Sequence, residues 1–232
     1  MPRTVKLALL FALIIVALLA AASAASAAAK LTADYRFEGN FKSKIGNVPN
    51  LIASGGGGSF GTETIGGSNN GVWNFPDSVG VELHKAGRAM GDKGKTYTFV
   101  MLMNLDDVAD DSYDKLVDFD NLDADEGWYI YDHSLYPYDV NNFEYEKQEV
   151  QAGKWEQIAL TRNARGIVTG YVGDKRIDSA RDKHKQVVLG DDKILHFLMD
   201  DSNPGEASPG AIARLRIWRS ALSGKTIKHL GR

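Results

Sequence analysis

Residues 197–222, FLMDDSNPGEASPGAIARLRIWRSAL, predict a β-strand, an acidic loop rich in Pro and Gly, and a second β-strand. Side chains of a strand alternate between the two faces of its sheet. The second strand should therefore have one apolar face and one face that carries arginines. The predicted apolar face holds Ala213, Leu215 and Ile217, and the opposite face holds Ile212, Arg214, Arg216 and Trp218.

A short helix is expected directly after this strand. Ser223 is a residue type that caps helix N-termini, and Ile227 and Leu230 are spaced to lie on one helical face. The chain should therefore end in a short C-terminal helix that packs on the sheet.

The rest of the chain continues the strand pattern. About a dozen short apolar or alternating segments are separated by turn residues at intervals of roughly eight to twelve residues. The segment 95–105 is apolar on both faces, which predicts a central strand. Helical periodicity is scarce, and no linker divides the sequence. These patterns predict one all-β domain, an antiparallel jelly-roll β-sandwich over residues 28–232.

Four stretches, in order, resemble bacterial laminin-G-like domains of the concanavalin A-like lectin and glucanase superfamily. They are YRFEGN at 35–40, KLVDFDN at 115–121, LTRNARGIVTGYVG at 160–173, and the acidic loop with GAIARLRIW that ends at Trp218. The resemblance implies a concanavalin A-like sandwich and recognition outside the cell. This superfamily is defined by fold more than by activity, so the fold prediction is the stronger one.

The N-terminus has the layout of a secretory signal peptide. Arg3 and Lys6 precede an apolar run at 7–22, and Ala-x-Ala steps follow, so cleavage is expected after Ala27. An uncleaved membrane anchor is the alternative, because the uncharged stretch is long enough to span a bilayer. We expect a bacterial protein that is secreted to the cell exterior as a monomer.

Composition excludes several kinds of protein. Loss of residues 1–27 would take the formal charge from −3 to −5, since the leader holds two basic residues and no acidic one. Lys and Arg form no cluster along the sequence that would suggest a nucleic-acid partner. Cysteine is absent, which excludes disulfides, thiolate metal sites and a cysteine nucleophile. The five histidines have no zinc spacing.

Clustered carboxylates make calcium a candidate cofactor. Calcium takes six to eight oxygen ligands, and acidic residues gather in three predicted loops. The stretch at 121–132 departs from an EF-hand loop, because Glu126 stands where glycine would make the turn and Asp132 where a bidentate glutamate would bind. Two interpretations of the acidic loops remain: they hold a Ca²⁺ ion between them, or they are turns whose carboxylates are only solvated. The predicted metal ligands are Asp118, Asp120, Asp200 and Asp201.

Aromatic residues between 128 and 145 are candidates for a ligand surface, because sugar rings stack on exposed aromatic faces. Trp128 and Ile130 should share one face of their strand, and Tyr129 and Tyr131 the other. One of these pairs must be buried, and the pattern does not decide which. The predicted ligand-binding residues are Trp128, Tyr129, Tyr131, Tyr136 and Tyr138.

We therefore expect a non-catalytic module that binds a glycan or an extracellular protein. A retaining glycoside hydrolase is one alternative, since Glu144, Glu146 and Glu149 echo the E-x-D-x-x-E strand of sandwich-fold glucanases. Against it, the central aspartate is a glutamate, and Lys and Gln stand between the carboxylates. A structural or adhesive extracellular module is the third alternative.

Overall fold

The computed structural model describes residues 29–91, 93–108, 110–145, 149–200 and 206–230. The predicted leader, Glu146 and Asp201 lie outside these ranges. The chain separates into two compact units, Met1–Lys30 and Leu31–Arg232, and the sandwich described below is the second one. Within the described ranges, no helix is long and apolar enough to cross a membrane.

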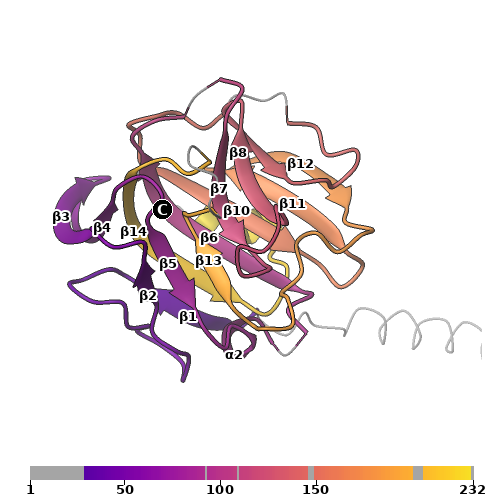
Figure 1. Ribbon diagram of the computed structural model, residues 1–232, viewed down its shortest axis with the longest axis horizontal. Coiled ribbons are helices and arrows are strands. Elements are labelled where there is room, and N and C mark those ends of the chain that lie inside the picture. Colours follow the sequence, from indigo (N-terminus) through magenta and orange to yellow (C-terminus); the bar gives the residue numbers. More distant parts are fainter. Residues whose placement is uncertain (1–28, 92, 109, 146–148, 201–205, 231–232) are drawn as a thin grey trace, which may run out of the picture. The chain divides into compact units, whose positions relative to one another are not determined.

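Two antiparallel sheets form the second unit (Figure 1). The larger has eight strands in the order β12-β11-β10-β6-β14-β4-β3, and β1 pairs with the other half of β14. Its strands are β1 (Leu31–Tyr35), β3 (Ser59–Ile65), β4 (Ser68–Phe75), β6 (Tyr97–Leu105), β10 (Glu156–Arg162), β11 (Ile167–Val172), β12 (Lys175–Arg181) and β14 (Gly210–Trp218).

The second sheet has six strands in the order β2-β5-β13-β7-β8-β9. Its strands are β2 (Ile52–Ser54), β5 (Gly80–Leu83), β7 (Tyr113–Asp118), β8 (Gly127–Tyr131), β9 (Ser134–Pro137) and β13 (Leu195–Phe197). The all-β antiparallel sandwich predicted from the sequence is confirmed. β2 and the single-turn helix α2 (Gly87–Met90) were not predicted.

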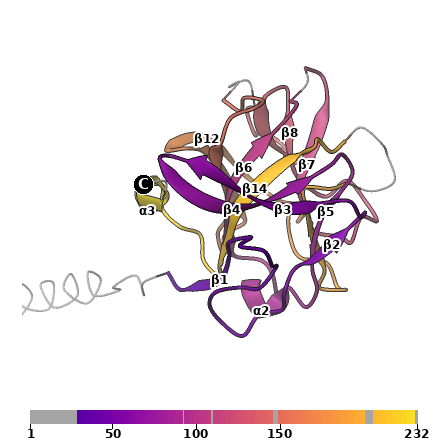
Figure 2. The same cartoon turned by 90° about the vertical axis from the view of Figure 1, so that its left-hand side faces the viewer.

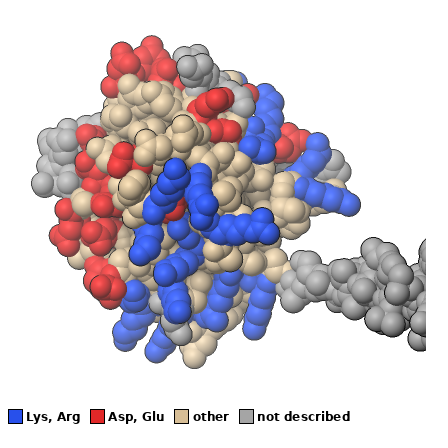
Figure 3. Space-filling view, turned by 90° about the vertical axis from the view of Figure 1, so that its right-hand side faces the viewer, with Lys and Arg blue, Asp and Glu red and all other residues tan. Residues whose placement is uncertain are grey.

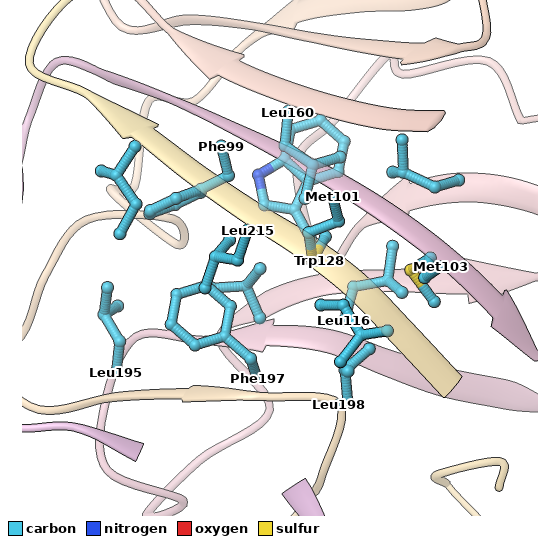
Figure 4. Close-up of a cluster of buried hydrophobic side chains, with 14 of the residues drawn as sticks. Phe99, Met101, Met103, Leu116, Trp128, Leu160, Leu195, Phe197, Leu198 and Leu215 are labelled. Carbon is cyan, nitrogen blue, oxygen red and sulfur yellow. The ribbon is translucent and has the colours of Figure 1, made fainter. Parts of the chain in front are cut away.

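The core lies between the sheets (Figure 4). Phe99 and Met101 of the central strand β6 point into it and are inaccessible to solvent. Trp128 and Phe197 meet them from the second sheet. Alternation along β6 therefore buries every second side chain between the sheets, and the remaining ones face outward.

A β-bulge corrects the predicted faces of β14. The pairing register between β14 and β6 shifts between Ile212 and Arg214. Ile212 consequently lies in the core with Leu215 and Ile217, and Ala213 joins the outer, arginine-bearing face. Strict alternation was wrong at Ile212 and Ala213, because a bulge inserts one extra residue into its strand.

The C-terminal helix α3 (Gly224–Leu230) packs on the outer face of the larger sheet, as predicted. The backbone N–H of Thr226 donates to Ser223 Oγ at 3.2 Å, which is the expected N-cap bond. Ile227 is buried in a small outer cluster with Val100, Ala159 and Trp218. The helix therefore covers part of this face and leaves the rest open.

Candidate functional site

Strand β8 settles which aromatic pair is buried in the core. Trp128 and Ile130 lie between the sheets with no exposed surface. Trp128 is therefore not accessible to a ligand in this structure, contrary to its predicted role. Tyr129 and Tyr131 point to the outer side of the six-stranded sheet, where Tyr131 is half-buried.

Six tyrosines gather on this outer side, and we call them the tyrosine patch. Its members are Tyr113, Tyr129, Tyr131, Tyr136, Tyr138 and Tyr145. The rings of Tyr113 and Tyr131 stack with centroids 4.4 Å apart, and Tyr136 and Tyr145 meet edge to face at 5.2 Å. The structure thus brings together four of the five predicted ligand-binding residues and adds Tyr113 and Tyr145.

Five members of the patch are partly exposed, and Tyr129 lies beneath them with 1% of its surface accessible. Burial and the neighbouring tyrosines raise the pKa of Tyr113 to about 12. Burial and the nearby Asp111 carboxylate also raise the pKa of Tyr131. The hydroxyl groups of Tyr113 and Tyr131 therefore stay protonated at neutral pH, and the surface offers ring edges and hydroxyls to a partner.

A buried lysine lies under the patch. The Lys115 Nζ is 3.1 Å from Asp118 Oδ2, 3.0 Å from Asp200 Oδ1 and 4.5 Å from the centre of the Tyr129 ring. The Lys115 side chain has no exposed surface. Two predicted calcium ligands, Asp118 and Asp200, thus converge, but the cation between them is the lysine's own ammonium group.

Asp120 contacts this pair through its backbone, because its N–H donates to Asp118 Oδ1 at 3.1 Å. Asp120 is half-buried in the loop after β7, where burial and the carboxylates of Glu126 and Asp192 raise its pKa. Among the described residues, no group of three or more His, Asp or Glu side chains could hold a metal ion. Asp201 lies outside those residues, and calcium binding stays a prediction.

Two of the three glutamates of the hydrolase alternative, Glu144 and Glu149, lie in described segments, and neither belongs to a strand. Glu144 is exposed, and its backbone N–H donates to Asp178 Oδ2 at 2.8 Å. Glu149 lies in a groove on the other sheet, where it pairs with Lys175 at 2.8 Å. Glu144 does not line this groove.

The groove runs over the outer face of the eight-stranded sheet and encloses about 1210 Å³. Its walls are the β3–β4 hairpin and α3, and Figure 2 views both elements from the same side. Its floor is made by outward-facing residues of β6, β10 and β14, among them Leu102, Gln157, Ala213, Arg214 and Arg216. The bulge in β14 therefore helps to build the groove.

One aromatic ring stands at the edge of the groove. Trp155 is half-buried just before β10, and its indole N–H donates to Glu63 Oε2 of β3 at 2.9 Å. This bond links the hairpin to the floor and fixes the orientation of the indole. Asn69, Asn70 and Gln157 add amide groups. The sequence did not reveal this site, because its lining comes from segments far apart in the chain.

Carboxylates in the groove are partly neutralised by neighbours. Asp174 pairs with Lys228 at 2.6 Å, as Glu149 does with Lys175. Burial raises the pKa of Glu156, although the backbone N–H of Gln151 and the ammonium of Lys154 oppose this shift. Arginines occupy the opposite side, where Arg36 and Arg214 both contact Asp34.

A basic pocket of about 400 Å³ lies beside β11 and β12. Five exposed cations line it, namely Lys95, Arg165, Arg181, Lys183 and Lys185. Figure 3 shows Lys and Arg side chains gathered on the side of the molecule that bears these strands. These residues are dispersed along the sequence, and the fold brings them together from separate segments.

The sequence matches no protein-family model and no curated protein. Among solved structures, domain 4 of AbnA superposes with a TM-score of 0.66 at 18% identity, over 88% of this chain and 99% of that domain. AbnA is a GH43 extracellular arabinanase from Geobacillus stearothermophilus, and its domain 4 was solved in complex with arabinotriose.

Toxin binding domains share the fold as well. A structure of botulinum neurotoxin type C has a TM-score of 0.59 at 14% identity. Cell entry of that toxin depends on interaction with two ganglioside molecules. The binding domain of Paraclostridial Mosquitocidal Protein 1 has a TM-score of 0.58 at 17% identity. This chain spans about half of each, 50% and 51% respectively. At these identities the likeness shows a sandwich fold that carbohydrate-binding domains also use.

Proposed function

We propose that this chain is an exported, non-catalytic binding module that holds a glycan in the groove of its eight-stranded sheet. The observation that carries the proposal is the groove itself, about 1210 Å³ of open space with an indole at its edge and amide, guanidinium and carboxylate groups along its lining. Binding sites for small ligands combine such concavity with a few fixed polar groups. The signal-peptide pattern of residues 1–27 supports export.

The chemistry of the groove suits a sugar. Trp155 offers an aromatic face to the C–H bonds of a pyranose or furanose ring, and its bond to Glu63 fixes the ring before binding. Asn69, Asn70 and Gln157 can donate to and accept from hydroxyl groups. One structural neighbour named above, domain 4 of AbnA, was solved with arabinotriose, which supports the same class of partner.

Titration calorimetry with glycans found on an array tests this proposal. Trp155→Ala should weaken binding by about tenfold, because a stacked aromatic contact and its bond to Glu63 are both lost. Trp155→Phe keeps an aromatic face and should retain most of the affinity. Equal affinities of the wild type and Trp155→Ala for every bound glycan would place the site elsewhere. A folded wild type that binds no glycan would leave a protein partner as the interpretation.

A glycoside hydrolase is the second candidate, and one observation favours it. Glu149 and Glu156 line the same groove, and burial raises the pKa of Glu156, as a general acid requires. The ion pair of Glu149 with Lys175 opposes a nucleophilic role. Release of reducing sugar that Glu156→Gln abolishes would establish hydrolysis. We expect bound glycans to remain intact over long incubation with the wild type.

A further inference from the structure

Arg216 is a buried cation on the floor of the groove. It is 8% exposed, and its Nη2 donates to Gln157 Oε1 and to the backbone carbonyl of Leu230, both at 3.3 Å. Its Nε is buried and has no hydrogen-bond partner among the described residues. No carboxylate within that part of the chain forms an ion pair with it. A buried polar group left in this state calls for an explanation.

The charges around Arg216 do not neutralise it. Arg214 and Arg36 lie nearby and share one carboxylate, Asp34, whose oxygens are 2.7–3.0 Å from the two guanidinium groups. Asp34 is the carboxylate that these guanidiniums contact, whereas Glu38, which also lines the groove, pairs with Lys44 at 2.7 Å. Burial first, and then the positive charge of Arg214, lower the pKa of Arg216 to about 10, so it remains charged at neutral pH.

Strand geometry explains why these positive charges gather. Arg214 and Arg216 are two residues apart on β14, so their side chains lie next to each other on one face. The bulge after Ile212 turns that face toward the groove. Asp34 and Arg36 belong to the chain around β1, which pairs with the same half of β14. The excess charge is therefore built into the sheet.

We propose that this groove binds an acidic sugar and that Arg216, with Arg214 and Arg36 beside it, recognises the sugar carboxylate. This inference rests on the proposed glycan-binding function and adds the class of glycan. The fork of a guanidinium matches a carboxylate better than it matches a hydroxyl, and such bonds are stronger when both groups are charged. On the other side of the groove, Glu149 and Asp174 pair with Lys175 and Lys228 and not with the arginines.

The test uses pairs of related glycans in which one member carries carboxylates and the other is neutral. Trigalacturonate and its methyl ester are one pair, and an array of uronate- and sialate-bearing glycans with their neutral counterparts supplies the others. We expect the acidic member of at least one pair to bind about tenfold more tightly at low salt. The preference should shrink at high salt, because screening weakens interactions between exposed charges.

Variants then assign the preference to the arginines. Arg216→Gln should bring the acidic and neutral members within about twofold of each other, while Trp155→Ala weakens both. Arg36→Gln is the second variant, in case Arg216→Gln does not fold. The Arg36 side chain is 45% exposed, so its replacement should leave the fold intact. It should reduce the preference for the acidic member. Arg176→Gln is the matched control, since Arg176 is exposed and does not line the groove.

The outcomes separate the two proposals. Equal binding of acidic and neutral members by the wild type overturns this inference and leaves glycan binding in the groove intact. A preference for acidic glycans that Arg216→Gln and Arg36→Gln both retain also overturns it. Failure of every glycan to bind overturns the proposed function itself. In the NMR spectrum, the Arg216 guanidinium signals should shift on addition of the preferred acidic glycan and remain unchanged with its neutral counterpart.

Discussion

At the scale of single residues, Asp114 is expected to make stability depend on pH. Its carboxyl group is 4% exposed and accepts a hydrogen bond from Ser208 Oγ at 2.5 Å. Burial raises its pKa to about 6, with a further contribution from Asp107, while Ser208 opposes the shift. The folded protein therefore keeps a proton between the usual value of 3.8 and about 6, where the unfolded chain has lost it.

The free energy of unfolding should consequently fall as pH rises through that window and stay lower above it. Asp114→Asn removes this titration and should stabilise the protein at about pH 7, by about 3 kcal/mol at most, with little effect near pH 4. Urea unfolding at both pH values measures the difference. Asp191→Asn, at an exposed position whose charge is not among those that shift the pKa of Asp114, is the control. An equal effect of Asp114→Asn at both pH values would contradict the assigned titration.

Lys115 provides a second prediction at this scale. Lys115→Met leaves Asp118 and Asp200 buried beside each other without the ammonium group that compensates them. We expect a loss of about 3–5 kcal/mol in the free energy of unfolding, as for a broken buried ion pair. Lys228→Met breaks an exposed pair with Asp174 and should cost less than about 1 kcal/mol.

The same variant tests the calcium prediction. In the wild type, Lys115 competes with any metal ion for Asp118 and Asp200. Calcium should therefore raise the Tm of Lys115→Met more than it raises that of the wild type, measured against EDTA. Equal responses would remove these two carboxylates from the list of ligands. The sequence made both acids candidate metal ligands, but it could not show that a lysine three residues before Asp118 would lie between them.

At the scale of elements, glycines in the 55–58 loop fix how the β3–β4 hairpin packs. Four consecutive glycines have the composition of a flexible connection. A Cβ added at Gly58 would lie 2.4 Å from the buried indole of Trp73, whereas one added at Gly56 would meet nothing within 4 Å. Gly58 is thus required by a close approach to the core.

Gly58→Ala should therefore destabilise the protein by about 2 kcal/mol or more, since it overpacks against Trp73. Gly56 has a φ of +78°, so Gly56→Ala should cost about 1 kcal/mol for backbone strain alone. Thermal melts of the two variants make the comparison. A larger loss for Gly56→Ala would mean that the loop moves away from Trp73 easily.

Strand β14 shows how far sequence patterns reach at this scale. Its existence and the following capped helix could be predicted, because periodicity and capping are local signals. The bulge between Ile212 and Arg214 could not, since it is stabilised by pairing with β6, more than a hundred residues earlier in the chain. That one irregularity decides which side chains form the floor of the groove.

At the scale of the whole sandwich, the two outer faces differ in character. The six-stranded sheet carries the tyrosine patch, and the eight-stranded sheet carries the groove. Local alternation predicted that aromatic rings would cluster, but the groove needs the final arrangement of both its walls. The basic pocket also joins residues from separate segments. Sites assembled from distant segments leave little trace in a single sequence.

The two faces lead to a last prediction about long glycans. A polysaccharide chain can contact the tyrosine patch and the groove on different stretches, so each contact adds to its apparent affinity. Tyr136→Ala should weaken binding of a polysaccharide by about fivefold, the value of one aromatic contact, and leave trisaccharide binding in the groove unchanged. Tyr136→Phe keeps the ring and should behave like the wild type. If Tyr136→Ala binds the polysaccharide as tightly as the wild type does, the patch is not a glycan contact, and a protein partner becomes the better explanation for its exposed rings.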